Sequence, residues 1–402
     1  MKIVAKGSAM SIGQLLLLVG IFTKQFYFFS SGSIQIADLM LFSAAIILFG
    51  EYKIRLLRSH TALLAFELFV FCINSIYALA LHTASFMTVN FYYLYNLAIM
   101  LAFIPLIDDK QFLEKLLFVF KMIILVQLLV LLSGRGRSYL SVRYMGTFND
   151  PNQYGFFVFS SGIFISNLSK IFNKPYGIWM ILEFILIIVS ASTGLLLGFS
   201  IMIVIDLICN TKISLRKKAL KILVLVSAVA VFFLIRLNIV HLPLSINNLT
   251  IVRRLTLKMQ TYSSQAGTLW VERGWDRLLH YPEVMLYGSG EGELTRFGGS
   301  NMEIHSNFFA PLFYYGIIPT CFFLKWCFQQ LHGISRKYWG AYLGLFIESI
   351  TLYHLRQPFF WMLIVFAGSR LVRENEEKGI RENEADFYSR RTNLLQRERT
   401  IL

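Results

Sequence analysis

The feature that most constrains this chain of 402 residues is a long series of apolar runs separated by short polar stretches. A helix needs about 20 apolar residues to cross the ~30 Å hydrocarbon core of a bilayer. It also satisfies its own backbone polar groups there, so it is the usual spanning element. Charged residues make up only 15% of the chain, well below the share that is usual in soluble domains. The sequence therefore predicts an all-α, polytopic helical membrane protein.

The apolar runs predict about 12 transmembrane helices. The predicted spans are 10–29, 34–50, 61–81, 88–106, 114–133, 151–168, 175–190, 193–209, 220–239, 304–326, 338–355 and 358–372. Residues 1–372 would form one transmembrane domain, followed by a charged tail at 373–402. The first run is interrupted by Lys24 and is followed by no small-residue cleavage site, so we interpret it as a retained span.

Basic residues in the short loops predict the orientation, because cytoplasmic loops carry an excess of lysine and arginine. Under the twelve-span arrangement the basic segments fall on one side; they are the N-terminus, "EYKIRLLRSH", "SKIFNKP", "TKISLRKKALK" and "SRKYW". That side is predicted to be the cytoplasm, and the even number of spans places both termini there. Contact with anionic lipid explains the net charge of +15 without a nucleic-acid partner.

Two predicted outer segments break this charge rule. One is 134–150, and the other is a long extracytoplasmic loop at 240–303. Their basic residues are Arg135, Arg137, Arg143, Arg253, Arg254, Lys258, Arg273, Arg277 and Arg296. Basic residues in extracytoplasmic segments oppose the usual excess of lysine and arginine in cytoplasmic loops, so we expect them to have a function of their own. The planar guanidinium group matches phosphate oxygens, and a diphosphate on a lipid carrier is a substrate that would face outward.

The long loop also contains the other candidate residues. Arg273, Arg277 and His280 would share one face of a helix, which predicts an amphipathic surface helix whose arginines bind either substrate or lipid headgroups. We interpret "YGSGEGE" (287–293) as a flexible turn. His305, where the chain re-enters the membrane, is either an interfacial residue or a general base or hydrogen-bond donor.

We expect no metal and no other cofactor. The pair Asp108–Asp109 lies in a predicted cytoplasmic loop, and the histidines are scattered along the chain. Arginines would then neutralise a diphosphate leaving group, as Mg²⁺ does in other enzymes.

Three motifs occur in order on the predicted outer side: "RYMGTFNDPNQYG" (143–155), "ERGWDRLLHYPEVMLYGSGEG" (272–292) and "HSNFFAPLFYYGIIP" (305–319). They resemble the R-x-x-G-x-F-x-D-P-N stretch, the arginine–tryptophan segment and the H-[NSQ]-x9-G-x-x-[GTY] motif of the O-antigen ligase and O-antigen polymerase superfamily. Two positions depart from the family pattern. Pro319 stands at the last position of the third motif. Thr193 stands where the family often has arginine, which puts more of the phosphate binding on Arg143 and Arg273.

The resemblance implies a metal-independent glycosyltransferase of the cytoplasmic (inner) membrane, with its active site facing outward. Its donor and acceptor would be undecaprenyl-diphosphate-linked glycans, and its other partners would be membrane lipids and a chain-length regulator. The resemblance implies His305, Arg143 and Arg273 as catalytic residues. The residues that we expect to bind substrate are Arg135, Arg137, Asn152, Arg253, Arg254, Arg277 and Asn307.

Three functions remain open. A polymerase would join repeat units into O-antigen, capsular or exopolysaccharide, and we favour it. A ligase would transfer finished glycan to lipid A core or another acceptor, with the same motifs. A transporter or flippase of lipid-linked glycan would need charges distributed within the spans, whereas most charged residues of the predicted spans lie near their ends.

Overall fold

The computed structural model describes residues 10–29, 34–52, 58–139, 143–209, 270–271, 273–298 and 303–373. Within these residues the chain is mostly helical. The strands that it contains are β1 (Arg137–Tyr139) and β2 (Arg143–Gly146), which pair antiparallel. The predicted all-α class is therefore confirmed for the described part of the chain.

The helices follow the predicted apolar runs closely. They are α1 (Ile12–Thr23), α2 (Ile36–Glu51), α3 (Thr61–Leu81), α4 (Ser85–Phe103), α5 (Lys110–Leu132), α6 (Pro151–Ile171), α7 (Gly177–Ser190), α8 (Thr193–Cys209), α13 (Arg277–His280), α14 (Val284–Tyr287), α15 (Phe309–Tyr315), α16 (Ile317–Leu331), α17 (Trp339–Thr351) and α18 (Pro358–Ala367). Every predicted span overlaps one of these helices except 220–239, which lies outside the described residues.

Three helical segments are long and apolar enough to cross a membrane: Thr61–Leu81, Ser85–Leu106 and Lys110–Leu132. The second joins α4 to a short 3-10 turn, Ile104–Leu106. Several other helices are apolar but have 10–17 residues. These lengths and compositions indicate a membrane protein. The count of twelve spans and their orientation stay predictions.

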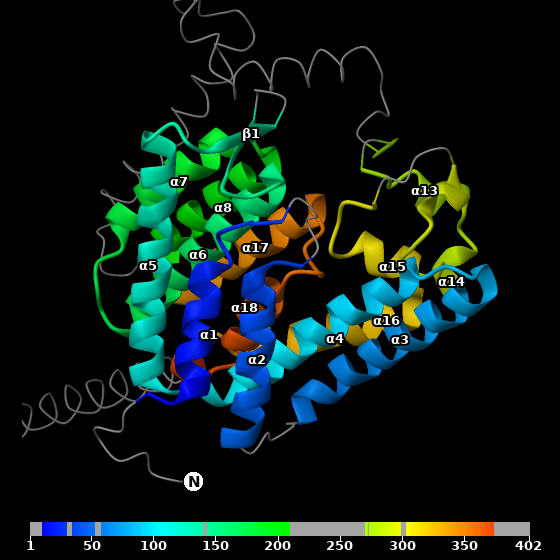
Figure 1. Ribbon diagram of the computed structural model, residues 1–402, viewed down its shortest axis with the longest axis horizontal. Helices are drawn as coiled ribbons and strands as arrows, with labels where there is room; N and C mark the ends of the chain where they lie inside the picture. Colours follow the sequence, from blue (N-terminus) through cyan, green and yellow to red (C-terminus); the bar gives the residue numbers. More distant parts are fainter. Residues whose placement is uncertain are drawn as a thin grey trace, which may run out of the picture.

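The centre of the helical bundle is formed by α6 and α18 (Figure 1). Every residue of α18 is buried, and so is almost all of α6. A helix that is apolar all round is expected in such a position. Aromatic rings join these two helices to their neighbours: Phe120 stacks on Phe164 with centroids 4.5 Å apart, and Phe157 meets Phe359 edge-on.

Small residues bring α8 and α17 close together. A Cβ atom at Gly198 would lie 2.7 Å from the carbonyl oxygen of Gly344. Glycine therefore permits the close backbone approach that is common between membrane helices. This crossing fixes the C-terminal end of α17, from which the chain turns into α18.

The predicted span 304–326 is wrong in one respect. The chain is non-helical from 303 to 308, and the helix that follows is interrupted at Gly316. Gly316 has φ +82°, and a Cβ there would lie 2.8 Å from the carbonyl oxygen of Leu286. This left-handed conformation and close contact require glycine, so α15 and α16 are separate helices. His305 consequently lies in the coil before α15.

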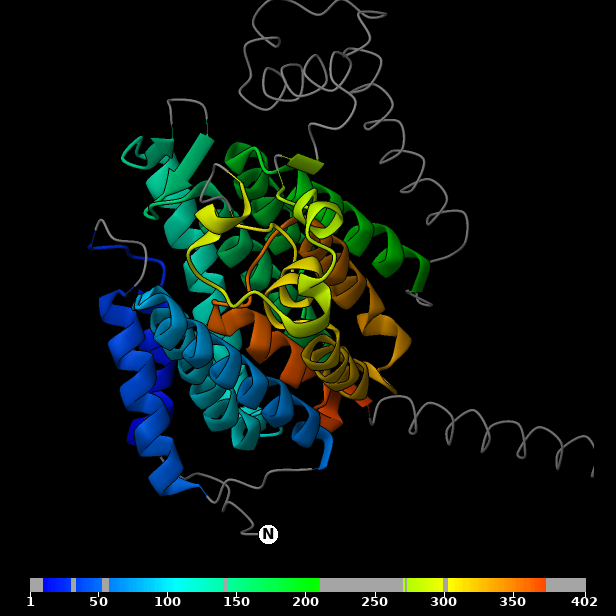
Figure 2. The same cartoon turned by 90° about the vertical axis from the view of Figure 1, so that its right-hand side faces the viewer.

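The β1–β2 hairpin and α13 lie toward the same end of the molecule (Figure 1). A view from the side shows residues 273–298, in yellow, lying over the orange helices α17 and α18 (Figure 2). The motif segments that are far apart in the sequence therefore approach one another at this end.

Candidate functional site

The turn between α17 and α18, residues 351–357, contacts the second and third motifs and the residue that follows the first motif; we call it the connector. Arg273 donates a hydrogen bond to the carbonyl oxygen of Thr351. The backbone N–H of His354 donates to Oδ1 of Asn307 at 2.6 Å. The imidazole ring of His354 stacks on Phe156 with the centroids 3.8 Å apart and the planes 12° apart. Arg273 of the second motif, Asn307 of the third motif and Phe156, which directly follows the first motif, therefore contact one short loop.

Arg143 and Asn152, both predicted from the first motif, are in direct contact. Nη2 of Arg143 donates to Oδ1 of Asn152 at 2.7 Å, and Nε donates to the carbonyl oxygen of Ser190 at 3.1 Å. Asp150 caps α6 by accepting from the backbone N–H of Asn152 and of Gln153. Aspartate at the N-cap followed by proline is a favoured start for a helix. The D-P-N sequence thus begins α6 and presents Asn152 to Arg143.

Arg273 and His305 lie side by side through their backbones. The N–H of His305 donates to the carbonyl oxygen of Arg273 at 3.0 Å. Nε1 of Trp275 donates to the carbonyl oxygen of His305 at 3.2 Å. The imidazole is half-buried, and none of the described residues forms a hydrogen bond with it. The structure therefore leaves both ring nitrogens of His305 available for a ligand.

The environment of His305 favours its neutral form. Desolvation by burial lowers the pKa of His305, and the positive charge of Arg273 lowers it further. Glu303 acts in the opposite direction, but its contribution is smaller. In its neutral form the imidazole has one nitrogen that is able to accept a hydrogen bond.

The side chain of Asn307 links the connector to the end of α17. Its Nδ2 donates to Oγ of Ser349 at 3.0 Å, while its Oδ1 accepts from His354. Its backbone N–H donates to the carbonyl oxygen of Ser349 at 2.8 Å. The carboxamide is wholly buried, so Asn307 positions the connector relative to His305.

The prediction of an amphipathic helix carrying Arg273, Arg277 and His280 on one face is wrong. Gly274 has φ +67°, which interrupts any helix there, and α13 contains only the four residues Arg277–His280. Arg273 turns toward the connector, Arg277 is 4% exposed, and His280 is exposed. Arg277 instead lines a pocket of about 260 Å³, whose other lining residues are Val271, Gly274, Asp276, His280, Tyr281, Phe297 and Gly298.

The other predicted arginines lie elsewhere or outside the described residues. Arg135 precedes β1 and is exposed. Arg137 on β1 donates to Oδ1 of Asn149 and to the carbonyl oxygen of Tyr27, so it contacts the segment that follows α1. Arg253 and Arg254 lie outside the part of the chain that the structure describes.

The sequence analysis missed Glu291 and Arg356. Glu291 is wholly buried and accepts hydrogen bonds from the hydroxyls of Tyr315 at 2.6 Å and Tyr353 at 2.8 Å. Arg356 donates to Glu291 at 2.7 Å and to Glu303 at 2.5 Å. The one available sequence signal was an arginine in the very short turn between two predicted spans.

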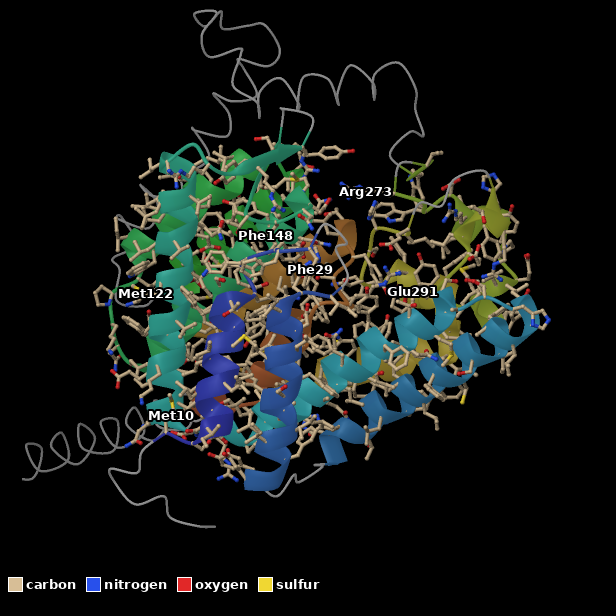
Figure 3. All side chains as sticks on the ribbon, in the orientation of Figure 1. Met10, Phe29, Met122, Phe148, Arg273 and Glu291 are labelled. Carbon is tan, nitrogen blue, oxygen red and sulfur yellow. The ribbon has the colours of Figure 1, made fainter. Side chains whose placement is uncertain are left out.

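The segment "YGSGEGE" is a buried loop, so its interpretation as a flexible turn is wrong. Residues 288–291 are buried, and Gly290 donates its N–H to the carbonyl oxygen of Tyr314 at 2.8 Å. Glu291 lies below Arg273 in the view of Figure 3. The loop contacts the connector through the ion pair between Glu291 and Arg356.

The arginines of the site differ in their electrostatic role. Arg356 is paired with two carboxylates, which cancel its charge. The oxygens of Ser190, Asn152 and Thr351 are neutral acceptors. These bonds orient Arg143 and Arg273, and a planar guanidinium group is a donor that matches the oxygens of an anion.

Comparisons of the chain with protein-family models and with curated proteins give no match. The resemblance to the O-antigen ligase and O-antigen polymerase superfamily therefore rests on the three sequence motifs.

Proposed function

We propose that this chain is a polysaccharide polymerase of the O-antigen ligase and O-antigen polymerase superfamily. It joins polyprenyl-diphosphate-linked repeat units into O-antigen, capsular polysaccharide or exopolysaccharide. The observation that supports the proposal is that Arg273 and His305 share a backbone hydrogen bond beside the connector, which Arg273 also contacts, while Phe156, directly after the first motif, stacks on His354 of the connector.

In this proposal the two guanidinium groups bind the diphosphate of the donor. The bond between the anomeric carbon and the diphosphate oxygen breaks, and its electron pair stays with that oxygen. Arg143 and Arg273 stabilise the charge that develops there, which is the type of contact that contributes most to such transition states. An acceptor hydroxyl forms the new bond to the anomeric carbon.

The neutral imidazole of His305 orients the acceptor hydroxyl and accepts its proton. Its lowered pKa and the positive charge of Arg273 beside it make it ill-suited as a further cation. A base at this position would contribute about 10²–10⁴-fold to the rate.

The substrate reaches this site from the outer face of the cytoplasmic membrane, where the connector and the hairpin would lie. The proposed orientation follows from the basic short loops, which would face the cytoplasm with both termini. The segment 240–303 would be extracytoplasmic and 373–402 a cytoplasmic tail.

Two buried ion pairs of the described residues support a structural role for these four charges. Lys24 and Asp38 form an ion pair at 2.5 Å, and Lys170 and Asp206 form another at 2.6 Å. Paired charges that link neighbouring helices are typical of structural contacts in membranes, where an isolated charge is costly.

Deletion followed by gel analysis of surface glycan tests the proposal. In the deletion strain we expect surface glycans that carry a single repeat unit, and this result would support the polymerase. Polymer that is made but not attached would identify a ligase, and an unchanged glycan pattern would refute both.

A further inference from the structure

Glu303 and His305 share one face of the segment that leads into α15. Ile304 between them is wholly buried, whereas Glu303 and His305 are both partly exposed. The N–H of Ile304 donates to the hydroxyl of Tyr314 at 2.9 Å, and the N–H of His305 donates to the carbonyl oxygen of Arg273 at 3.0 Å. Alternating burial is typical of an extended backbone, in which residues i and i+2 point to the same side. The carboxylate of Glu303 therefore lies on the face that presents the imidazole.

Arg356 fixes the position of this carboxylate. Its Nη1 donates to Oε1 of Glu303 at 2.5 Å, and its Nε donates to Oε1 of Glu291 at 2.7 Å. The rings of Tyr92 and Tyr353 lie 5.9 Å and 5.6 Å from the guanidinium group, within the range of a cation–π contact. Because carboxylates and aromatic rings both hold Arg356, Glu303 is attached to a rigid support.

The cluster formed by Glu291, Arg356 and Glu303 runs from the core toward the surface. The side chain of Glu291 is 0% exposed, that of Arg356 28% and that of Glu303 40%. Glu291 is fully engaged, since it accepts from Arg356 and from two tyrosine hydroxyls. None of the described residues bonds Oε2 of Glu303. An ionised carboxylate has about four acceptor positions, so Glu303 keeps acceptor capacity at the exposed end of the cluster.

The charge of the cluster indicates which ligand this capacity suits. Two carboxylates and one guanidinium group leave one negative charge in excess, which disfavours the diphosphate of the donor. An ionised carboxylate only accepts hydrogen bonds, so its partner must be rich in donors, as the hydroxyls of a saccharide are. His305 thus has a cationic neighbour, Arg273, bonded to its backbone, and an anionic neighbour, Glu303, on its own face.

Resting on the proposed function, we propose that Glu303 binds hydroxyl groups of the acceptor saccharide next to the hydroxyl that reacts at His305. In this arrangement Arg273 serves the donor diphosphate and Glu303 serves the acceptor. Glu303 takes no part in breaking or forming a covalent bond. Its hydrogen bonds orient the acceptor ring, so that the reacting hydroxyl points toward the imidazole.

Binding of two probes to the full chain in detergent tests this inference. The oligosaccharide released from lipid-linked repeats by mild acid represents the acceptor, and inorganic diphosphate represents the charged part of the donor. In Glu303→Gln the Kd of the oligosaccharide should rise about 10-fold, the difference between a charged and a neutral hydrogen bond. The Kd of diphosphate should not rise, because the variant removes a negative charge.

Turnover of lipid-linked repeats separates binding from catalysis. KM of Glu303→Gln should rise more than its kcat falls, and the pH profile should keep its shape, as expected for a contact made equally before and during the reaction. Glu283→Gln is the matched control, because Glu283 is an exposed carboxylate in the same segment, 273–298; it should bind both probes as the wild type does.

The variant should fold, because Arg356 keeps Glu291 as its counter-charge. Glu303→Asp is a second variant, which keeps the charge and shortens the reach by one methylene group. It should also weaken binding of the oligosaccharide and leave binding of diphosphate unchanged. A monodisperse elution profile in detergent is checked for each variant, so that a folding defect is recognised as such.

Two results would overturn the inference and leave the polymerase in place. One is wild-type affinity for the oligosaccharide in both Glu303 variants, and the other is an equal loss of affinity for the two probes, which indicates a structural role. Wild-type protein that binds the oligosaccharide but does not polymerise the repeats would instead overturn the proposed function.

Discussion

Replacing Arg143 and Arg273, the two arginines that we propose to bind the diphosphate, by lysine is the most direct test of the site. Nε of Arg143 donates to Ser190 while Nη2 donates to Asn152, so the guanidinium group bridges β2, α6 and the end of α7. Lysine carries the same charge on a single nitrogen and is unable to reproduce a planar fork of donors. Arg143→Lys and Arg273→Lys should therefore both be strongly impaired.

The expected size of the effect follows from the contact that is lost. A charge-assisted donor to the leaving group contributes about 2–4 kcal/mol of transition-state stabilisation, which corresponds to about a 30- to 900-fold loss of kcat/KM. The assay is polymerisation of purified lipid-linked repeats at matched membrane levels. Arg336→Lys is the matched control, because Arg336 is exposed and lies in a predicted cytoplasmic loop. Wild-type polymer from both Lys variants would refute the reasoning and reduce these arginines to lipid anchors.

Three further predictions follow from the site and its surroundings. Activity should fall on the acidic side of the pH profile, because a neutral His305 must accept a proton; His305→Ala and His305→Gln should lose about 10²–10⁴-fold in turnover. Rescue by His305→Arg alone, with activity falling toward alkaline pH, would instead identify a cationic phosphate contact. Turnover should survive EDTA, because no group of three His, Cys, Asp or Glu side chains gathers within the described residues; loss on chelation with rescue by Mg²⁺ would contradict this. Alkaline phosphatase fused within 255–300 should be active and a fusion after Leu371 inactive, and the reverse pattern would invert the proposed orientation.

The helices of the bundle could be predicted from the sequence because each apolar run exceeds the length of a short buried helix. The boundaries of α3, α7 and α8 agree with the predicted spans within two residues. The start of α6 could also be predicted from the sequence, because Asp150–Pro151 is a local capping signal. Local periodicity and local caps depend on neighbouring residues only, and a sequence displays those directly.

The failures have a different physical origin. The helix predicted over Arg273 and Arg277 assumed ordinary backbone geometry, but Gly274 adopts a left-handed conformation that the loop requires. The break at Gly316 likewise depends on a carbonyl oxygen of Leu286, which is 30 residues away in the sequence. A glycine in the sequence indicates that a left-handed backbone conformation is permitted. Whether the residue adopts it depends on the segment that packs against it in the fold.

Charge pairing was the least predictable feature of the site. Glu291 and Arg356 are 65 residues apart, and neither local sequence identifies the other residue as its partner. Their contact depends on how residues 273–298 fold over the connector. Because a buried arginine needs a counter-charge, Arg356 in a short turn between apolar helices does predict an unidentified acidic partner, but not which one.

The segment "SASTG" (190–194) contacts the groups that orient Arg143 and Arg273. Thr193 occupies the position where an arginine is often found. In this structure the carbonyl oxygen of Ser190 orients Arg143, and Gly194 packs against the hydroxyl of Thr351, whose carbonyl oxygen orients Arg273. The segment that lacks its own arginine therefore contacts the anchors of the two arginines that remain. Thr193 carries no charge, but the neighbouring residues Ser190 and Gly194 contact the groups that orient Arg143 and Arg273. We therefore expect anion binding to depend on Arg143 and Arg273.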